Sequence, residues 1–172
     1  MNSTLEFIIK RFGPQINRKY LTKIREINQT IMAKTLRELN FKVGAEVGVT
    51  QGGYVEILCR ENPNLKLYAV DIWESYPGYD NYGDRIGKYY SEAQEKQAPY
   101  NCKLLKMFSA DAAEDFVDGS LDFVYIDGAH DFNKVTIDIE HGYEPKLTNW
   151  DIKNEINDNR QPSWYFFKWD KA

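Results

Sequence analysis

The chain has 172 residues, of which 42% are hydrophobic and 28% are charged, and its formal net charge is −4. This length corresponds to one ordinary domain, and the composition is that of a globular protein rather than a disordered one. The acidic balance argues against a nucleic-acid-binding surface, which needs clustered basic side chains. No apolar run approaches the roughly 20 residues that span a bilayer, and the first residues lack the pattern of a signal peptide, so we expect no signal peptide, no membrane contact and a cytoplasmic location.

The first forty residues predict helices. An apolar stretch around Phe7 begins a first helix, which the Gly13–Pro14 pair ends. A second helix is expected from about Gln15 to Asn40, because its apolar residues recur at three- and four-residue intervals. These residues are Ile24, Ile27, Ile31, Leu36 and Leu39. We expect a single domain over 1–172, in which residues 1–40 form a helical cover and residues 41–172 form the core.

From residue 41 onward the pattern alternates between strands and helices. Strands are expected at 41–49, 65–71, 101–107, 121–126 and 164–169. Helices are expected at 52–60, 84–97, 110–116, 133–143 and 151–157. Repeated strand–helix units predict an α/β fold, a doubly wound and mostly parallel sheet with helices on both faces.

A glycine turn follows the first strand of this pattern. Gly48 comes directly after Glu46–Val47 and lets the backbone approach a ligand, while Gly52 and Gly53 open the next helix. In such sheets ligands bind beyond the carboxyl ends of the strands. The spacing Gly48-x-x-x-Gly52 differs from the Gly-x-Gly-x-x-Gly fingerprint of dinucleotide binders, which makes a pyrophosphate ligand less favoured.

Two acidic residues accompany this turn. Asp71 ends the second strand, where a carboxylate can accept hydrogen bonds from ribose hydroxyls, each contributing about 1.5–3 kcal/mol. Glu46 places a second carboxylate beside the same site, and two acids favour a cationic ligand such as S-adenosylmethionine over NAD. The alternative for a strand-end acid is a helix cap or a solvated loop residue.

The third strand is followed by Phe108–Ser109–Ala110–Asp111. In this architecture such a loop lies alongside the adenine edge of a nucleotide. Ser109 has equally the chemistry of an N-cap for the short helix that follows, and the two roles are compatible.

The fourth strand delivers Asp127 to the carboxyl edge of the sheet, with Gly128 and His130 close behind. An Asp and a His at one pocket are candidates for a general base or for metal ligands. A helix-capping or surface histidine is the alternative for His130, and His141 is interpreted in that way. The aromatic segment 73–82 is expected to cover an acceptor, or else to pack on the sheet or on another subunit.

Together these segments resemble a known family. The motif Glu46-x-Gly48-x-x-x-Gly52 and the stretches 68–73 and 120–130 resemble the class I S-adenosylmethionine-dependent methyltransferases. More narrowly they resemble a small group with Asp-Gly-x-His after the fourth strand and a later Pro-Lys-Leu turn, here at 145–147. The resemblance covers about residues 41–147, with weaker similarity at 164–168.

The resemblance implies a role for each matching residue. Glu46 and Gly48 would border the methionine part of the cofactor, with Asp71 at the ribose, and Asp127 and His130 would face the transferred methyl group as the catalytic pair. Some relatives hold a divalent cation at this position, which makes Asp127 the candidate metal ligand. The cofactor-binding residues expected in this way are Glu46, Gly48, Gly52, Asp71, Ile72, Ser109, Ala110, Asp111 and Asp127.

The sequence departs from these relatives after Leu147. They continue with a Gly-Gly turn, a fifth strand and a second His-Asp pair, whereas this chain goes directly to the segment 151–156. The missing segment shortens the side where the acceptor and a metal would bind. We therefore weigh three functions: methylation of an oxygen on a small molecule or sugar, a non-catalytic S-adenosylmethionine-binding scaffold or regulatory protein, and an NAD-dependent oxidoreductase. A homo-oligomer is left open.

Overall fold

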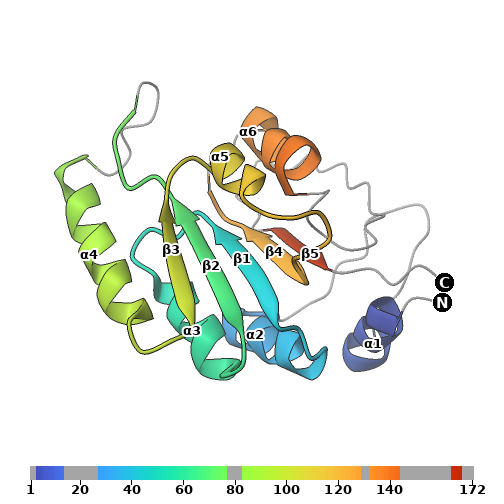
Figure 1. Cartoon of the computed structure of the whole chain (residues 1–172). Coiled ribbons are helices and arrows are strands. Elements are labelled where there is room, and N and C mark those ends of the chain that lie inside the picture. Colours follow the sequence, from blue (N-terminus) through green and yellow to red (C-terminus); the bar gives the residue numbers. More distant parts are fainter. Residues whose placement is uncertain (1–2, 14–26, 77–82, 129–131, 144–163, 168–172) are drawn as a thin grey trace.

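The computed structural model describes residues 3–13, 27–76, 83–128, 132–143 and 164–167. Its centre is a five-stranded sheet in the order β3-β2-β1-β4-β5 (Figure 1). The strands are β1 (Val43–Val47), β2 (Lys66–Asp71), β3 (Cys102–Lys106), β4 (Phe123–Ile126) and β5 (Trp164–Phe167). The helices are α1 (Ser3–Phe12), α2 (Gln29–Glu38), α3 (Gly53–Glu61), η1 (Gly83–Arg85), α4 (Ile86–Gln97), α5 (Ser109–Glu114), α6 (Phe132–Thr136) and η2 (Ile137–Tyr143).

Four of the five strands are parallel. β1 pairs with β2 on one side and with β4 on the other, and β2 pairs with β3. β5 runs antiparallel to β4, with Phe123 opposite Phe167 and Ile126 opposite Trp164. The predicted α/β fold with a mostly parallel sheet is confirmed, and the strand order reverses between β1 and β4, which is where such sheets bind ligands.

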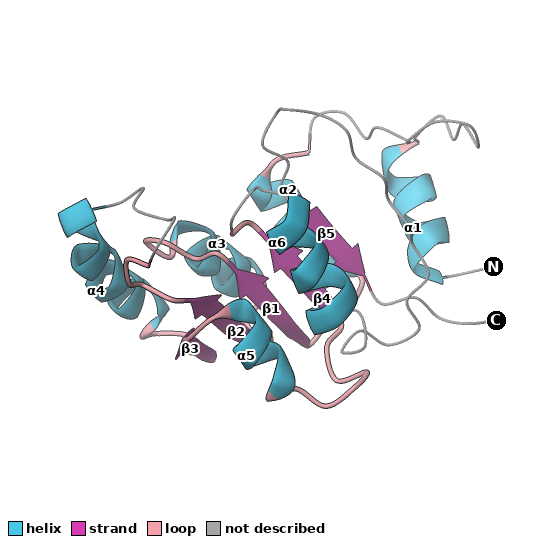
Figure 2. Cartoon of the chain, turned by 90° about the horizontal axis from the view of Figure 1, so that it is seen from above, coloured by secondary structure: helices cyan, strands magenta, loops and turns pink. Residues whose placement is uncertain are grey.

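Helices cover both faces of the sheet, as Figure 2 shows from above. On one face α2, α3 and α4 pack over Leu67, Ala69, Phe123 and Tyr125. The side chains of a strand alternate between faces, so the neighbouring strand residues point the other way. They are Ala45, Val47, Val124 and Ile126, and they pack against α5 and η2.

The helix predicted from Gln15 to Asn40 is wrong at Ile27–Asn28, where the chain is not helical. The Asn28 side chain instead accepts a hydrogen bond of 2.9 Å from the Ile31 amide and caps α2, which begins at Gln29. Asparagine side chains compete with the helix in this way, whatever the apolar periodicity around them. The earlier part of that predicted helix, and the helix predicted at 151–157, lie outside the described residues.

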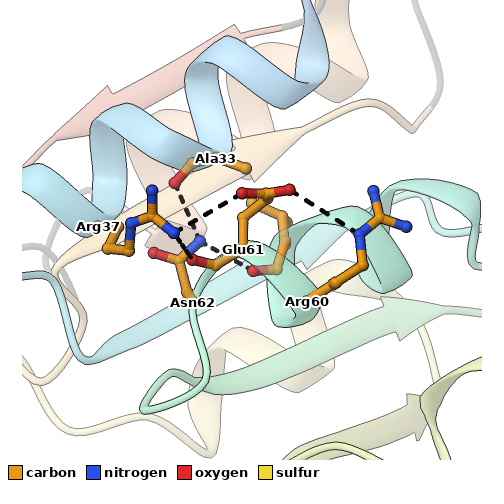
Figure 3. Close-up of polar contacts among 6 residues, drawn as sticks. Ala33, Arg37, Arg60, Glu61 and Asn62 are labelled. Atoms are coloured by element: carbon orange, nitrogen blue, oxygen red, sulfur yellow. Dashed lines mark hydrogen bonds and ion pairs between the residues drawn. The ribbon is translucent and has the colours of Figure 1, made fainter.

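Polar contacts join α2 to the end of α3 (Figure 3). The buried Asn62 side chain donates to the carbonyl oxygens of Ala33 and Leu58, at 2.9 and 2.8 Å. Arg37 donates to the Glu61 carbonyl oxygen at 3.1 Å, and its guanidinium lies 3.7 Å from the Glu61 carboxylate. These contacts attach α2 to the α/β core.

The helix after β4 is not a regular α-helix. α6 ends at Thr136 and continues directly as η2, a π-helical segment of seven residues. π-helical turns are rare and occur frequently at functional sites. Among the described helices, none has the length and apolar composition that a membrane span requires.

Candidate functional site

A cavity of about 370 Å³ lies at the carboxyl ends of β1, β2, β3 and β4. This volume is in the range of small-molecule and cofactor sites. Its described lining comes from the strand ends and the loops after them, from the start of α5 and from the α6–η2 helix. The residues are Val47, Gly48, Thr50, Val70, Asp71, Ile72, Tyr76, Met107, Phe108, Ser109, Ala110, Asp111, Asp127, Gly128, Lys134, Ile137 and Asp138.

Gly48 follows β1 directly and lies against the backbone at the end of β4. Its φ of +89° is one that residues with a side chain rarely adopt. A Cβ atom at this position would lie 2.4 Å from the carbonyl carbon of Asp127 and 2.4 Å from the amide nitrogen of Gly128. Gly48 is therefore required for the packing of the cavity floor as well as for access to it.

Gly52 has a structural role, and it does not line the cavity. It precedes α3 with a φ of +71°, and a Cβ atom there would lie 3.1 Å from the Cα atom of Ala93 in α4. The glycine therefore lets α4 pack against the start of α3.

Asp71 holds the glycine turn in place. Its Oδ2 atom accepts hydrogen bonds from the amides of Val49 and Thr50, at 2.9 and 2.8 Å. Its Oδ1 atom accepts from the Trp73 amide at 3.2 Å. Thr50 and Trp73 both have positive φ angles, of 50° and 43°, so these bonds fix two strained residues. A carboxylate has about four acceptor positions, so one position on Oδ1 is left for a ligand in the cavity.

Glu46 lies beneath the turn rather than in the cavity lining. Its residue is 2% exposed, it points to the α3 side of the sheet, and its Oε2 atom has no hydrogen-bond partner among the described residues. Burial raises the pKa of Glu46 well above the usual 4.5, and the nearby Asp127, Cys59 and Asp71 raise it further. This group of acidic side chains disfavours a further negative charge and favours a positive one.

Asp127 ends β4 and lines the cavity beside Gly128. Its Oδ2 atom accepts a 2.9 Å hydrogen bond from the hydroxyl of Tyr125, a buried ring that packs edge-on against Tyr54. His130 lies outside the described residues. Within the described ranges no cluster of three or more His, Cys, Asp or Glu side chains could hold a metal ion.

Ser109 does not cap α5 as its sequence position allowed. The N-cap is Phe108, without a side-chain cap, and Ser109 is the first helical residue. Its hydroxyl instead donates to Oδ1 of the buried Asp138 in η2, at 2.5 Å. The Tyr143 hydroxyl donates to the Ser109 carbonyl oxygen at 3.3 Å, and burial, together with Asp138, raises the pKa of Tyr143. A tertiary contact has replaced the local cap.

In the aromatic segment after β2, one described ring packs in the core and another lines the cavity. Trp73 is buried; its indole N–H donates to the Thr50 carbonyl oxygen at 2.7 Å, and its ring packs 4.9 Å from that of Tyr90. Tyr76 lines the cavity, where its ring meets that of Phe108 edge-on. Residues 77–82 lie outside the described part of the chain.

The cavity brings together seven of the residues predicted from the sequence. They are Gly48, Asp71, Ile72, Ser109, Ala110, Asp111 and Asp127. Sequence reasoning missed Lys134, Ile137 and Asp138, which reach the cavity from the helix after β4. A lysine and an aspartate four residues apart in a predicted helix look like a solvated face, so no local signal marked them.

The family model of the methyltransferase domain matches residues 45–149 of this chain, more than half of its length. The chain belongs to this methyltransferase family. The match begins at β1 and includes every strand end that borders the cavity. The predicted membership of the class I methyltransferases is thereby confirmed at the level of family and fold.

Solved structures with a similar arrangement include cofactor-bound Rv0187 from MTB, at 15% identity and a TM-score of 0.47 over 78% of this chain and 56% of that one. An O-methyltransferase from Bacillus cereus in complex with SAH has 15% identity and a TM-score of 0.45 over 76% and 56% of the two chains. The methyltransferase chain thus spans little more than half the length of these proteins. A comparison with curated proteins finds no match.

Proposed function

We propose that this protein is an S-adenosylmethionine-dependent methyltransferase. The observation that carries the proposal is the charge of the cavity at the strand ends: its described lining has four aspartates and one lysine. Such a site favours a cationic sulfonium cofactor, whereas the pyrophosphate of NAD would meet unfavourable charge. The membership of a methyltransferase family agrees with this choice.

The residues of the cavity fit this cofactor. Gly48 leaves the floor open beside Asp127, where the ammonium and sulfonium groups would meet the Asp127 carboxylate. Asp71 would accept a hydrogen bond from one ribose hydroxyl on its Oδ1 side. Ile72, Ala110 and Asp111 would then lie along the base. The N-terminal residues 1–40 would serve as a helical cover of the same domain, since α2 packs on α3.

When bound, the cofactor would supply a methyl group on a sulfonium; the S–CH3 bond would break as S-adenosylhomocysteine leaves as a neutral thioether. The protein has to align an acceptor oxygen with that methyl group and to remove the hydroxyl proton as the new bond to carbon forms. We assign the proton to His130, which follows Gly128 by two residues in the sequence. Asp127, held by Tyr125, would orient that imidazole.

The acceptor would be an oxygen of a small molecule or sugar. Phe108 lies at the cavity and is 49% exposed, with the Tyr76 ring 5.4 Å away. Exposed aromatic rings next to a site favour a flat or sugar-like ligand, because such ligands stack on them.

A second function, binding of S-adenosylmethionine without catalysis, has one observation in its favour. Among the described strands the outer neighbour of β4 is the antiparallel β5, which comes from the 164–167 segment. The relatives have their fifth strand after the Pro-Lys-Leu turn, a segment that this sequence is expected to lack after Leu147, and acceptor-binding residues would be lost with it. Release of S-adenosylhomocysteine in the presence of a panel of hydroxylated acceptors distinguishes an enzyme from a scaffold.

Titration calorimetry tests the cofactor. Micromolar binding of S-adenosylmethionine is expected; no heat with this ligand but clear heat with NAD would refute the proposal in favour of an oxidoreductase. Asp127→Asn should weaken the binding of S-adenosylmethionine about tenfold more than that of S-adenosylhomocysteine, because both ligands carry the ammonium but only the former carries the sulfonium charge. Asp115→Asn, an exposed residue outside the cavity, is the matched control.

The assignment of His130 and of a divalent cation has its own test. His130→Ala should abolish release of S-adenosylhomocysteine without changing its affinity, and unchanged turnover would remove His130 from the mechanism. The described residues give no support to a cation at Asp127. Turnover that EDTA abolishes and Mg²⁺ restores would assign one there.

A further inference from the structure

The cavity wall formed by α5 and η2 carries an unusual set of polar side chains. Those that line the cavity from these two helices are Ser109, Asp111 and Asp138. Two of them are carboxylates, which accept hydrogen bonds and donate none when ionised. The Ser109 hydroxyl can both donate and accept a hydrogen bond. The direction of its proton therefore decides whether this wall binds ligand donors or ligand acceptors.

The structure specifies the state of that hydroxyl. Ser109 has a single hydroxyl proton, and it is directed at Oδ1 of Asp138, with 2.5 Å between the two oxygens. This distance is typical of a charge-assisted bond between a hydroxyl and a carboxylate. Asp138 is only 5% exposed, so water competes poorly for the contact. Ser109 therefore has only its lone pairs left for a ligand, and all three side chains act as acceptors.

η2 also fixes the position of Ser109. Tyr143 donates to the Ser109 carbonyl oxygen at 3.3 Å, so the hydroxyl and the carbonyl of the same residue are both held by one helix. The two helices also pack closely at Gly142, where an added Cβ atom would lie 3.4 Å from that of Ala113 in α5. The wall is therefore fixed by the packing of two helices rather than by the loop after β3 alone.

We propose that Asp138 is a positioning residue that keeps the Ser109 hydroxyl an acceptor, so that this wall selects a 6-amino purine over a 6-oxo purine. The inference rests on the proposed function, in which the ligand is an adenosyl cofactor. The ribose side of the cofactor is assigned to Asp71 and the charged end to Asp127, so the base faces this wall, and the exocyclic amine is the hydrogen-bond donor of the adenine base. A 6-oxo purine has an acceptor oxygen in place of the amine and its N1–H donor one ring position away, so at the exocyclic position three acceptors would meet another acceptor and polar groups would be left unpaired.

Calorimetry of the whole chain with S-adenosylhomocysteine and with S-inosylhomocysteine, its 6-oxo counterpart, tests the proposal. The unmodified protein should prefer the amino form by at least about tenfold. In Asp138→Asn this preference should narrow about tenfold, because the amide can donate to the Ser109 oxygen and release the hydroxyl proton toward a 6-oxo group. Ser109→Ala should weaken the amino form about tenfold and leave the oxo form nearly unchanged.

The controls separate recognition from folding. Asp115→Asn removes an exposed acid from the end of the same helix and should change neither affinity. A purely structural role for Asp138 would weaken both nucleosides equally, and equal weakening in Asp138→Asn and Ser109→Ala would overturn the inference. An unmodified protein without preference between the two would also overturn it. Binding of neither nucleoside would overturn the proposed function itself.

Discussion

Removal of the Asp71 side chain should lower the stability of the protein even in the absence of a ligand. Asp71→Ala deletes the acceptor for the amides of Val49, Thr50 and Trp73, at 2.9, 2.8 and 3.2 Å. Two of these residues have positive φ angles, so the same carboxylate holds strained backbone. We expect the glycine turn to lose its conformation as well as its partner for the ribose.

The magnitude follows from these three bonds. An unsatisfied donor costs about 1–3 kcal/mol, with the lower end for groups that water can reach. The amides lie next to an open cavity, so about 1 kcal/mol each for Val49 and Thr50 is a fair value, and the longer bond to Trp73 adds less. Asp71→Ala should therefore lower the free energy of unfolding by about 2–3 kcal/mol, a sizeable share of the 5–15 kcal/mol typical of a domain.

Urea denaturation of three variants measures this effect. Asp71→Asn keeps an acceptor oxygen and should lose only about 1 kcal/mol. Asp84→Ala, an exposed residue of η1, should stay within about 0.5 kcal/mol of the unmodified protein. If Asp71→Ala were as stable as that control and lost only S-adenosylhomocysteine binding, Asp71 would act on the ligand alone, and our account of the turn would be refuted.

Three further predictions concern the frame around the site. The pKa of Glu46 is raised in the folded protein, so its contribution to stability is complete below pH 4.5 and is lost as the pH rises toward the folded-state pKa. Above pH 4.5 the unfolding free energy of the Glu46→Gln variant should therefore increase relative to that of the unmodified protein. Parallel pH profiles of the two proteins would contradict this. Gly48→Ala should lower the free energy of unfolding, measured by urea denaturation, by about 2–4 kcal/mol. Gly87→Ala, where a Cβ meets nothing within 4 Å, should instead raise it by up to about 1 kcal/mol by stabilising α4. Equal effects of the two substitutions would show that the backbone around Gly48 relaxes. Asn28→Ala should lower the melting temperature through the loss of about 1 kcal/mol from the cap of α2, and an unchanged melting temperature would mean that the cap contributes nothing.

The fold could be predicted from the sequence because its strands are short apolar runs between turn residues. The run that ends at Asp71 and the run that ends at Asp127 are both buried parallel strands, for which continuous apolar sequence is typical. The helix boundary at Asn28 could not be found in the same way. Apolar periodicity continues across it, and only a local hydrogen bond to Ile31 decides where α2 begins.

The site was predictable where it follows strand ends and unpredictable where it depends on packing between helices. Gly48 and Asp71 lie at positions that the topology alone brings to one edge. Asp138 lines the cavity from η2, where the packing of η2 against α5 brings its carboxylate to the Ser109 hydroxyl. Ser109 has the chemistry of a cap, and its actual partner is 29 residues away.

Trp73 makes the glycine turn observable by spectroscopy. Its indole N–H is bonded to the Thr50 carbonyl oxygen, and its ring is 2% exposed. The chain has four tryptophans, so replacing the other three by phenylalanine leaves Trp73 as the single tryptophan, whose emission can be excited apart from that of the tyrosines. A change in the emission of Trp73 when a ligand is added would then show that the glycine turn changes conformation as the ligand binds.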